Sequence, residues 1–326
     1  MNASKHWSRL KYSLPVSILV LALHAQADSD DDDDVRAGGR KATLAADAVR
    51  LPTGQLITPL APRGAVQQLL SPKLPAYPDF VAGMAVISEL SPDGSTLAIL
   101  CAGQNSLDKP DGTTDVENST QYIFLFDVSG ANREKPVLKQ VIKQTNAHVG
   151  LVFSPDGSKL YATGGRDDVV YVYAQNGGTW VSAGKIALGH ADTGLGIEVS
   201  PNASGLGISA DGRTLVVANN YNDSISVIDA ATNTVRYTHD LRPYHPANEG
   251  KQGGAGGTFP FGVVVHGNTV YVSSDRNREV IAIDISLETD GKLIKRIPLD
   301  GNALGMALDA SQARLFVAED NATRSR

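Results

Sequence analysis

Three histidines of the sequence stand just outside stretches that read as strands, where an imidazole ring could reach a ligand. His148 directly precedes an apolar run, His190 lies in "LGHADTG", and His245 follows Arg242 and Tyr244 in "LRPYHP". Histidine is a common ligand of divalent metals, and its ring can also polarise a substrate near neutral pH. Short polar turns add further candidates for ligand binding: Arg166, Asp167, Asn219, Asn220, Asp275 and Arg276.

The spacing of these residues matches no metal or nucleophile motif. No HxH, HxxxH or HExxH pair is present, so histidines that only make local hydrogen bonds remain an alternative. Asp108, Asp111, Asp115 and Glu117 could bind calcium, but their spacing differs from that of a calcium loop. No G-x-S-x-G serine and no CxxCH haem motif occurs. We therefore assign no catalytic residue and no evident cofactor, and leave calcium or another divalent metal open.

Residues 1–27 have the three-part layout of a secretory signal peptide. Lys5, Arg9 and Lys11 precede the apolar run "LPVSILVLAL", and "AQA" would place cleavage before Asp28. Cleavage would remove three positive charges and no acidic residue, which changes the formal net charge from −6 to −9. We expect an exported protein, periplasmic or secreted, with no membrane span after cleavage. Its acidity argues against a nucleic-acid partner.

Two regions follow the expected cleavage site. Residues 28–47 begin with "DSDDDDD", a run of like charge that predicts a disordered acidic linker. Residues 48–326 form the expected folded domain, in which Val, Ile and Thr are frequent, as is typical of strands. The single cysteine, Cys101, lies in the apolar stretch "LAILCAG", so we expect a buried side chain and no disulfide.

A unit of four short strands recurs along this domain. Its clearest copies are "SPDGSTLAILCAG" (91–103), "SPDGSKLYATGG" (154–165) and "SADGRTLVVANN" (209–220), and weaker copies are "HGNTVYVSSD" (266–275) and "DASQARLFVAED" (309–320). A glycine precedes each copy and opens its first predicted strand: Gly83, Gly150, Gly205, Gly262 and Gly305. Such a repeat predicts a chain built from one supersecondary unit.

The order of strands and turns in each unit predicts a β-propeller blade. An Asp-Gly or Gly-Asn turn joins the first two strands, an alternating third strand such as "SISVID" (224–229) follows, and a fourth such as "TVRYTHDL" (234–241) ends the unit. We expect an all-β, incomplete propeller with four full blades and half of a fifth. Because strands alternate in direction, the long insertions 104–121, 189–204 and 242–261 would emerge on one face, together with the candidate residues. We call this the loop-rich face, where binding is expected.

The letters of the third unit resemble those of the YVTN β-propeller repeat. The likeness is most specific in "VVANNYNDSISVIDAATNTV" (216–235), whose third strand ends in Ile-Asp. The stretches "LPTGQLITPLAPRGAV" (51–66) and "TFPFGVVVHGNTVYVSSDRNREV" (258–280) are similar to bacterial exported proteins in which a YVTN propeller precedes an alkaline-phosphatase-superfamily phosphoesterase. The resemblance implies a ring of seven blades. Because the repeat stops in "LFVAEDNATRSR" (315–326), we expect a truncated fragment of such a protein.

Two functions follow from these expectations. The first is an exported binding or interaction module that holds a small-molecule or protein ligand on the loop-rich face. The alternative is a hydrolase or lactonase-like enzyme, with a metal or substrate site at the mouth of the propeller channel, because related propellers include lactonases. The lack of a catalytic motif favours the first.

Overall fold

The structure is a computed structural model that describes residues 49–50, 56–57, 67–103, 105–190, 201–243, 258–309, 311–312 and 314–321. The expected signal peptide and acidic linker lie outside the described residues, as do Tyr244 and His245. The chain divides into two compact units, residues 1–65 and residues 66–326. In the first unit, β1 (Val49–Arg50) and β2 (Leu56–Ile57) pair as a small antiparallel sheet.

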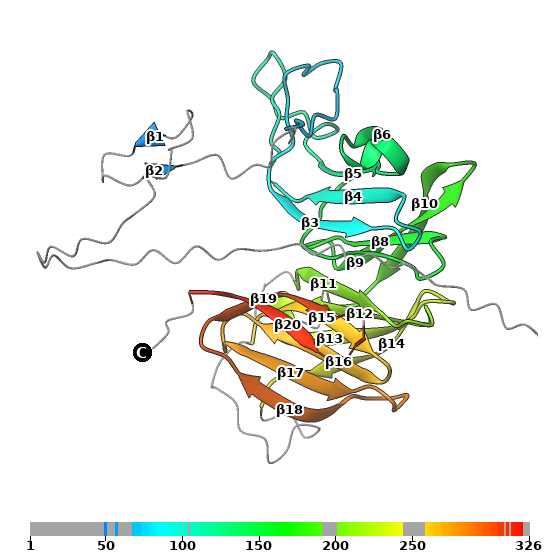
Figure 1. The fold of residues 1–326 in the computed structure, drawn as a ribbon, viewed down its shortest axis with the longest axis vertical. Helices are drawn as coiled ribbons and strands as arrows, with labels where there is room; N and C mark the ends of the chain where they lie inside the picture. Colours follow the sequence, from blue (N-terminus) through cyan, green and yellow to red (C-terminus); the bar gives the residue numbers. More distant parts are fainter. Residues whose placement is uncertain are drawn as a thin grey trace, which may run out of the picture. The chain divides into compact units, whose positions relative to one another are not determined.

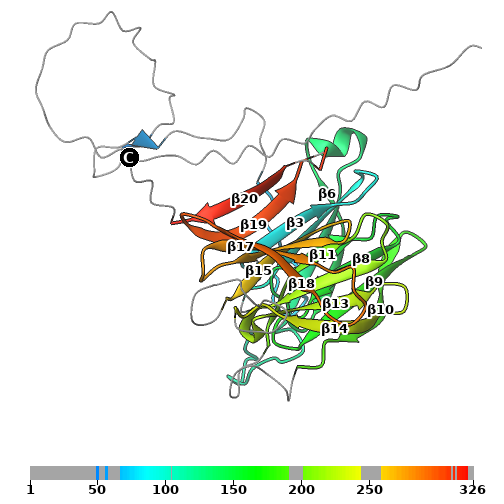
Figure 2. The same cartoon turned by 90° about the horizontal axis from the view of Figure 1, so that it is seen from below.

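Four antiparallel sheets of four strands each make up most of the second unit, and a two-stranded sheet follows them. Within every sheet the strands are paired in chain order, as the repeat predicts (Figures 1 and 2). The first blade contains β3 (Ala85–Leu90), β4 (Thr96–Cys101), β5 (Gln121–Asp127) and β6 (Val137–Gln144). The second contains β7 (Leu151–Phe153), β8 (Lys159–Thr163), β9 (Val169–Asn176) and β10 (Thr179–Ala187). The third contains β11 (Ala203–Ile208), β12 (Thr214–Asn219), β13 (Ser224–Asp229) and β14 (Thr234–Asp240). The fourth contains β15 (Pro260–His266), β16 (Thr269–Ser274), β17 (Glu279–Asp284) and β18 (Lys292–Pro298), and the last sheet contains β19 (Asn302–Leu308) and β20 (Leu315–Asp320).

The predicted all-β propeller fold is confirmed. Among the described residues, helical structure is limited to two short 3-10 turns, Gly130–Arg133 and Asn220–Asn222. Within the same residues no helix is long and apolar enough to cross a membrane.

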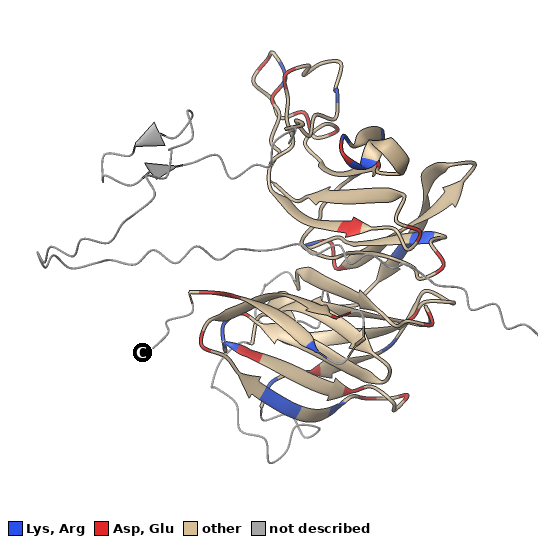
Figure 3. Cartoon of the chain, in the orientation of Figure 1, with Lys and Arg blue, Asp and Glu red and all other residues tan. Residues whose placement is uncertain are grey.

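The repeated Ser-x-Asp-Gly sequence forms one hydrogen-bonded turn in three blades. In the first blade the Ser91 hydroxyl donates to Asp93 at 2.5 Å and accepts the backbone N–H of Thr96 at 2.9 Å. Ser154 and Ser209 make the same two bonds at their own turns. These local bonds explain why the motif recurs, and Figure 3 shows acidic segments at many of the turns.

Three of the four hydrophobic clusters of the described residues lie between neighbouring sheets, and the fourth joins the first blade to residues 70–82. In β12, Leu215 and Val217 pack with the second blade, whereas Val216 and Ala218 pack with the fourth. Successive side chains of a strand point to opposite faces, so a strand between two blades buries both of its faces. This arrangement explains the continuous apolar run "TLVVA". A strand with one face in water would instead alternate apolar and polar residues.

The first strands of neighbouring blades approach each other closely at glycines. A Cβ atom on Gly150 would lie 2.4 Å from the carbonyl oxygen of Ser204, and one on Gly262 would lie 2.6 Å from that of Leu304. Gly83 precedes the first strand of the first blade by two residues, since β3 begins at Ala85. Ile87 occupies the place equivalent to Gly150, since each stands four residues before the turn serine.

Candidate functional site

Most residues predicted from the sequence lie in connections of the loop-rich face. Arg166 and Asp167 lie between β8 and β9, Asn219 and Asn220 lie at the end of β12, and Asp275 and Arg276 lie between β16 and β17. His148, His190 and Arg242 lie in connections between blades. Among the described candidates, the structure brings His190 and Asn219 into contact and distributes the others over several blades.

His190 is buried and tied to Asp168, which the sequence reasoning did not single out. Its backbone N–H and its Nδ1 bind the two carboxylate oxygens of Asp168 at 2.6 and 2.8 Å. Its Nε2 lies 3.5 Å from Nδ2 of Asn219 and 3.4 Å from the hydroxyl of Thr238. In the next blade Asp223 accepts the backbone N–H of Thr258 in the same way. The Asp168–His190 pair therefore anchors the connection between blades and does not open to a substrate.

The other predicted polar groups are also engaged locally. The carboxylate of Asp167 accepts hydrogen bonds from Asn146 at 2.6 Å and from Tyr171 at 2.9 Å. Asp275 accepts one from Asn302 at 2.9 Å, and Asn220 donates to the carbonyl of Pro260 at 3.0 Å. Asn219 donates hydrogen bonds to the hydroxyls of Ser224 and Ser226. Arg242 forms an ion pair with Asp240.

His148 makes a contact across three blades. Its Nδ1 lies 2.9 Å from the hydroxyl of Ser204 in β11, and its ring lies edge-on to Phe261 in β15, with centroids 5.9 Å apart. Burial lowers the pKa of His148 below its usual value, so the imidazole is neutral at neutral pH. A neutral imidazole beside a hydroxyl can act as a general base, although Ser204 itself is fully buried.

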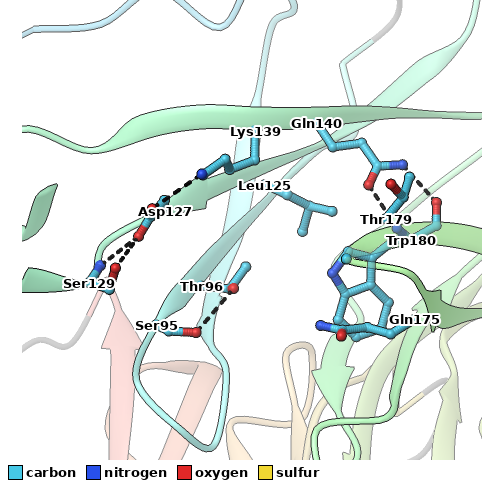
Figure 4. Close-up of a pocket in the computed structure, with 11 residues that line it drawn as sticks. Ser95, Thr96, Leu125, Asp127, Ser129, Lys139, Gln140, Gln175, Thr179 and Trp180 are labelled. Carbon is cyan, nitrogen blue, oxygen red and sulfur yellow. Dashed lines mark hydrogen bonds and ion pairs between the residues drawn. The ribbon is translucent and has the colours of Figure 1, made fainter.

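A cleft of about 370 Å³ opens between the first and second blades, at the end opposite the loop-rich face. In Figure 4, Lys139 and Asp127 lie on one side, Trp180 and Gln175 on the other, and Leu125 between them. The full lining is Ser95, Thr96, Leu125, Asp127, Ser129, Lys139, Gln140, Gln175, Gly178, Thr179 and Trp180. Sequence reasoning missed this cleft, because its walls come from strands of two different repeats.

One wall of the cleft is fixed by a double hydrogen bond between the blades. The side-chain amide of Gln140 donates to the carbonyl of Trp180 at 2.6 Å and accepts its backbone N–H at 2.8 Å. The indole also packs edge-on against Phe153, with ring centroids 5.5 Å apart. Trp180 is 6% exposed, so the scaffold sets its position before any ligand arrives.

The opposite wall carries both signs of charge. Asp127 and Lys139 form an ion pair at 3.4 Å, in which the lysine side chain is mostly exposed. The hydroxyl and backbone N–H of Ser129 donate to Asp127, and these bonds lower the pKa of the carboxyl to about 2. The group is therefore a carboxylate throughout the physiological range, able to accept hydrogen bonds and unsuited to donating a proton.

The described residues contain no cluster of three or more His, Cys, Asp or Glu side chains that could hold a metal ion. The acidic loop considered for calcium is used internally. Asp115 binds Asn118 at 2.8 Å and Tyr77 at 3.0 Å, and Asp111 binds Thr113 at 2.6 Å.

The backbone is similar to those of solved β-propeller structures. One is a "putative 6-phosphogluconolactonase" from Bacteroides uniformis (13% identity, TM-score 0.52, 74% of this chain and 66% of that one). Another, of the same description, is from Bacteroides fragilis (15% identity, TM-score 0.50, 74% and 65%). A third is a functionally unknown protein from Desulfotomaculum acetoxidans (11% identity, TM-score 0.50, 74% and 65%). The chain thus spans about two thirds of the length of each. No protein-family model and no curated protein sequence matches it. At these identities the likeness shows the fold alone.

Proposed function

We propose that this chain is a non-catalytic binding module whose ligand occupies the cleft between the first and second blades. The observation that carries the proposal is the cleft itself, a preformed hollow of about 370 Å³ lined by an aromatic residue and many hydrogen-bonding groups. Sites for small molecules are usually concave and largely preformed, with a few polar groups that fix orientation.

The chemistry of the lining favours a small ligand with several hydroxyl groups, such as a monosaccharide or a sugar acid. The side chains of Ser95, Thr179 and Gln175 can each donate and accept hydrogen bonds. Asp127 accepts from a hydroxyl group, and Lys139 donates to one or to a carboxylate. The lining hydroxyl of Ser129 donates to Asp127, whose lowered pKa makes the carboxylate a weak base, so the set favours recognition over catalysis.

The wider setting is also a proposal. The signal-like residues 1–27 favour export, and the YVTN-like repeats favour a place beside a phosphoesterase domain in a longer protein. The regular blades and their Ser-x-Asp-Gly turns support membership of the YVTN type.

The fluorescence of Trp180 tests the binding proposal directly. The chain has two tryptophans, so a Trp7→Phe variant leaves the one in the cleft as the only reporter. Titration with a panel of monosaccharides and sugar acids should give a saturable change for at least one member. Gln175→Ala and Asp127→Asn should weaken that binding about tenfold each.

Asp284→Asn is the matched control. Asp284 ends the third strand of its blade and accepts the N–H of Ser286, as Asp127 does with Ser129, but it lies outside the cleft. This variant should bind as the parent does. If no panel member changes the signal, or if all three variants behave alike, the cleft is not the ligand site.

A lactonase-like hydrolysis is the second candidate, and the His148–Ser204 contact at 2.9 Å favours it. The names of two neighbours of similar fold suggest the substrate to try, 6-phosphogluconolactone. Turnover that a chelator or His148→Gln abolishes would support an enzyme. Hydrolysis equal to the buffer rate would leave the binding module as the function.

A further inference from the structure

A second, separate group of side chains lies on the loop-rich face, where the third and fourth blades meet. The guanidinium of Arg276 lies over the ring of Phe259, with its central carbon 5.5 Å from the ring centroid. The same ring meets Tyr221 edge-on, with centroids 5.7 Å apart and planes at 89°. We call these three residues the aromatic–arginine platform. Only Arg276 was singled out from the sequence.

The backbone holds Phe259 in an unfavourable conformation. Its φ is +47°, in the left-handed region that a bulky side chain rarely adopts. Asp223 accepts the N–H of Phe259 at 3.1 Å, and the N–H of Asp275 donates to its carbonyl at 3.2 Å. Both bonds come from turns of neighbouring strands, so the blades fix the ring in place. A strained residue held in this way is preorganised for contact.

The arginines beside the platform are exposed, and the two nearby carboxylates, Asp223 and Asp275, accept hydrogen bonds from backbone and amide groups. Among the described residues no carboxylate lies within ion-pair distance of Arg276 or of Arg278, and both side chains are exposed. By contrast, the side chain of Arg296 is only 7% exposed and forms an ion pair with Glu279 at 2.5 Å. Two exposed guanidinium groups two residues apart attract an anion even though the chain as a whole is acidic.

We propose that the platform binds a small ligand in which a phosphate or carboxylate group is attached to a planar ring. The guanidinium of Arg276, which already lies over the ring of Phe259, can donate two parallel hydrogen bonds to such an anion. Tyr221 is 47% exposed and offers a ring face beside it for stacking. Arg278, two residues further along the same turn, is also exposed. The inference is independent of the cleft, which lies at the other end of the blades.

Calorimetric titration of the full chain with phenyl phosphate tests this proposal. Phenyl phosphate should bind at least about tenfold more tightly than inorganic phosphate, because only the former reaches both the guanidinium and Tyr221. Benzyl alcohol, which has the ring without the anion, should bind more weakly than either. Equal affinity for phenyl phosphate and inorganic phosphate, or no binding of phenyl phosphate, would overturn the proposal.

Variants then assign the site. Arg276→Gln should weaken binding of phenyl phosphate at least about tenfold, and Tyr221→Leu should remove its advantage over inorganic phosphate. Arg213→Gln is the control, since Arg213 is an exposed arginine in the turn at the opposite end of the third blade. Circular dichroism confirms that each variant is folded. If Arg276→Gln and Arg213→Gln reduce binding equally, the effect is one of net charge and the platform is not the site.

Discussion

Gly205 in β11 and Phe261 in β15 are in direct backbone contact, with no room for a side chain between them. A Cβ atom on Gly205 would lie 1.9 Å from the carbonyl oxygen of Phe261, which is far inside van der Waals contact. The first strands of the third and fourth blades can approach this closely only because residue 205 is glycine. Adding a side chain at residue 205 should therefore lower the free energy of unfolding by a measurable amount.

Gly205→Ala should lower the free energy of unfolding by about 3 kcal/mol, because either the methyl group or the adjacent strand must move. Gly305→Ala is the matched control, since Gly305 has the equivalent place in β19 and no atom within 4 Å of its Cβ position. Urea unfolding followed by circular dichroism measures both. Equal stability of the two variants would contradict the contact.

Replacing Gln140 should loosen the cleft wall. Gln140→Ala leaves the N–H and carbonyl of Trp180 without their side-chain partners, at an expected cost of about 2 kcal/mol. In a Trp7→Phe background the emission of Trp180 should shift to longer wavelength as water reaches the indole. Gln175→Ala, an exposed glutamine of the same cleft, should leave stability unchanged. An unshifted emission maximum in Gln140→Ala would show that the bond does not hold the wall.

His148 should make the protein less stable in mild acid. Burial lowers its pKa below 6.5, so between the two values the unfolded chain binds more protons than the folded one. Stability should therefore rise with pH through this window and fall as the pH drops below about 6.5. His148→Gln should flatten this part of the curve of melting temperature against pH. An unchanged slope would mean that His148 titrates normally.

Glu89 should make the protein less stable as the pH rises, which is opposite to the effect of His148. Burial raises the pKa of this carboxyl to about 7, above its unfolded value of 4.5. The folded state then favours the protonated form, so stability is lost as the pH rises from 4.5 through 7. Glu89→Gln should raise the free energy of unfolding by about 2 kcal/mol at pH 8 and have little effect at pH 4. A stabilisation that is the same at both pH values would argue against the raised pKa.

The blades could be predicted from the sequence because their signals are local. The turn at Ser154 and Asp156 closes within six residues, and the third-strand residue Asp229 binds the backbone of Ala231 and Thr232 just after it. Such bonds leave the Ser-x-Asp-Gly letters in the first three repeats. The strands expected at 224–229 and 234–241 accordingly match β13 and β14, which span Ser224–Asp229 and Thr234–Asp240.

The candidate sites were far less predictable because they depend on contacts between repeats. Gln140 and Trp180 are 40 residues apart and look like ordinary strand residues until the first two blades are side by side. Similarly, nothing in "GGTFPF" indicates that Phe259 adopts a positive φ, which is imposed by Asp223 from the preceding blade. The histidines were predicted as site residues from their chemistry alone, yet His190 has a structural role through its hydrogen bonds to Asp168.

Neighbouring sheets of this molecule share their hydrophobic core, and this determines the order in which the sheets should unfold. When one sheet unfolds, apolar side chains of the neighbouring sheets become exposed to water. Unfolding should therefore spread from one sheet to the next. The sheet with an uncovered apolar face should be the least resistant to heat and proteases. Its amide hydrogens should exchange first, followed by those of the next sheet and then the one after it.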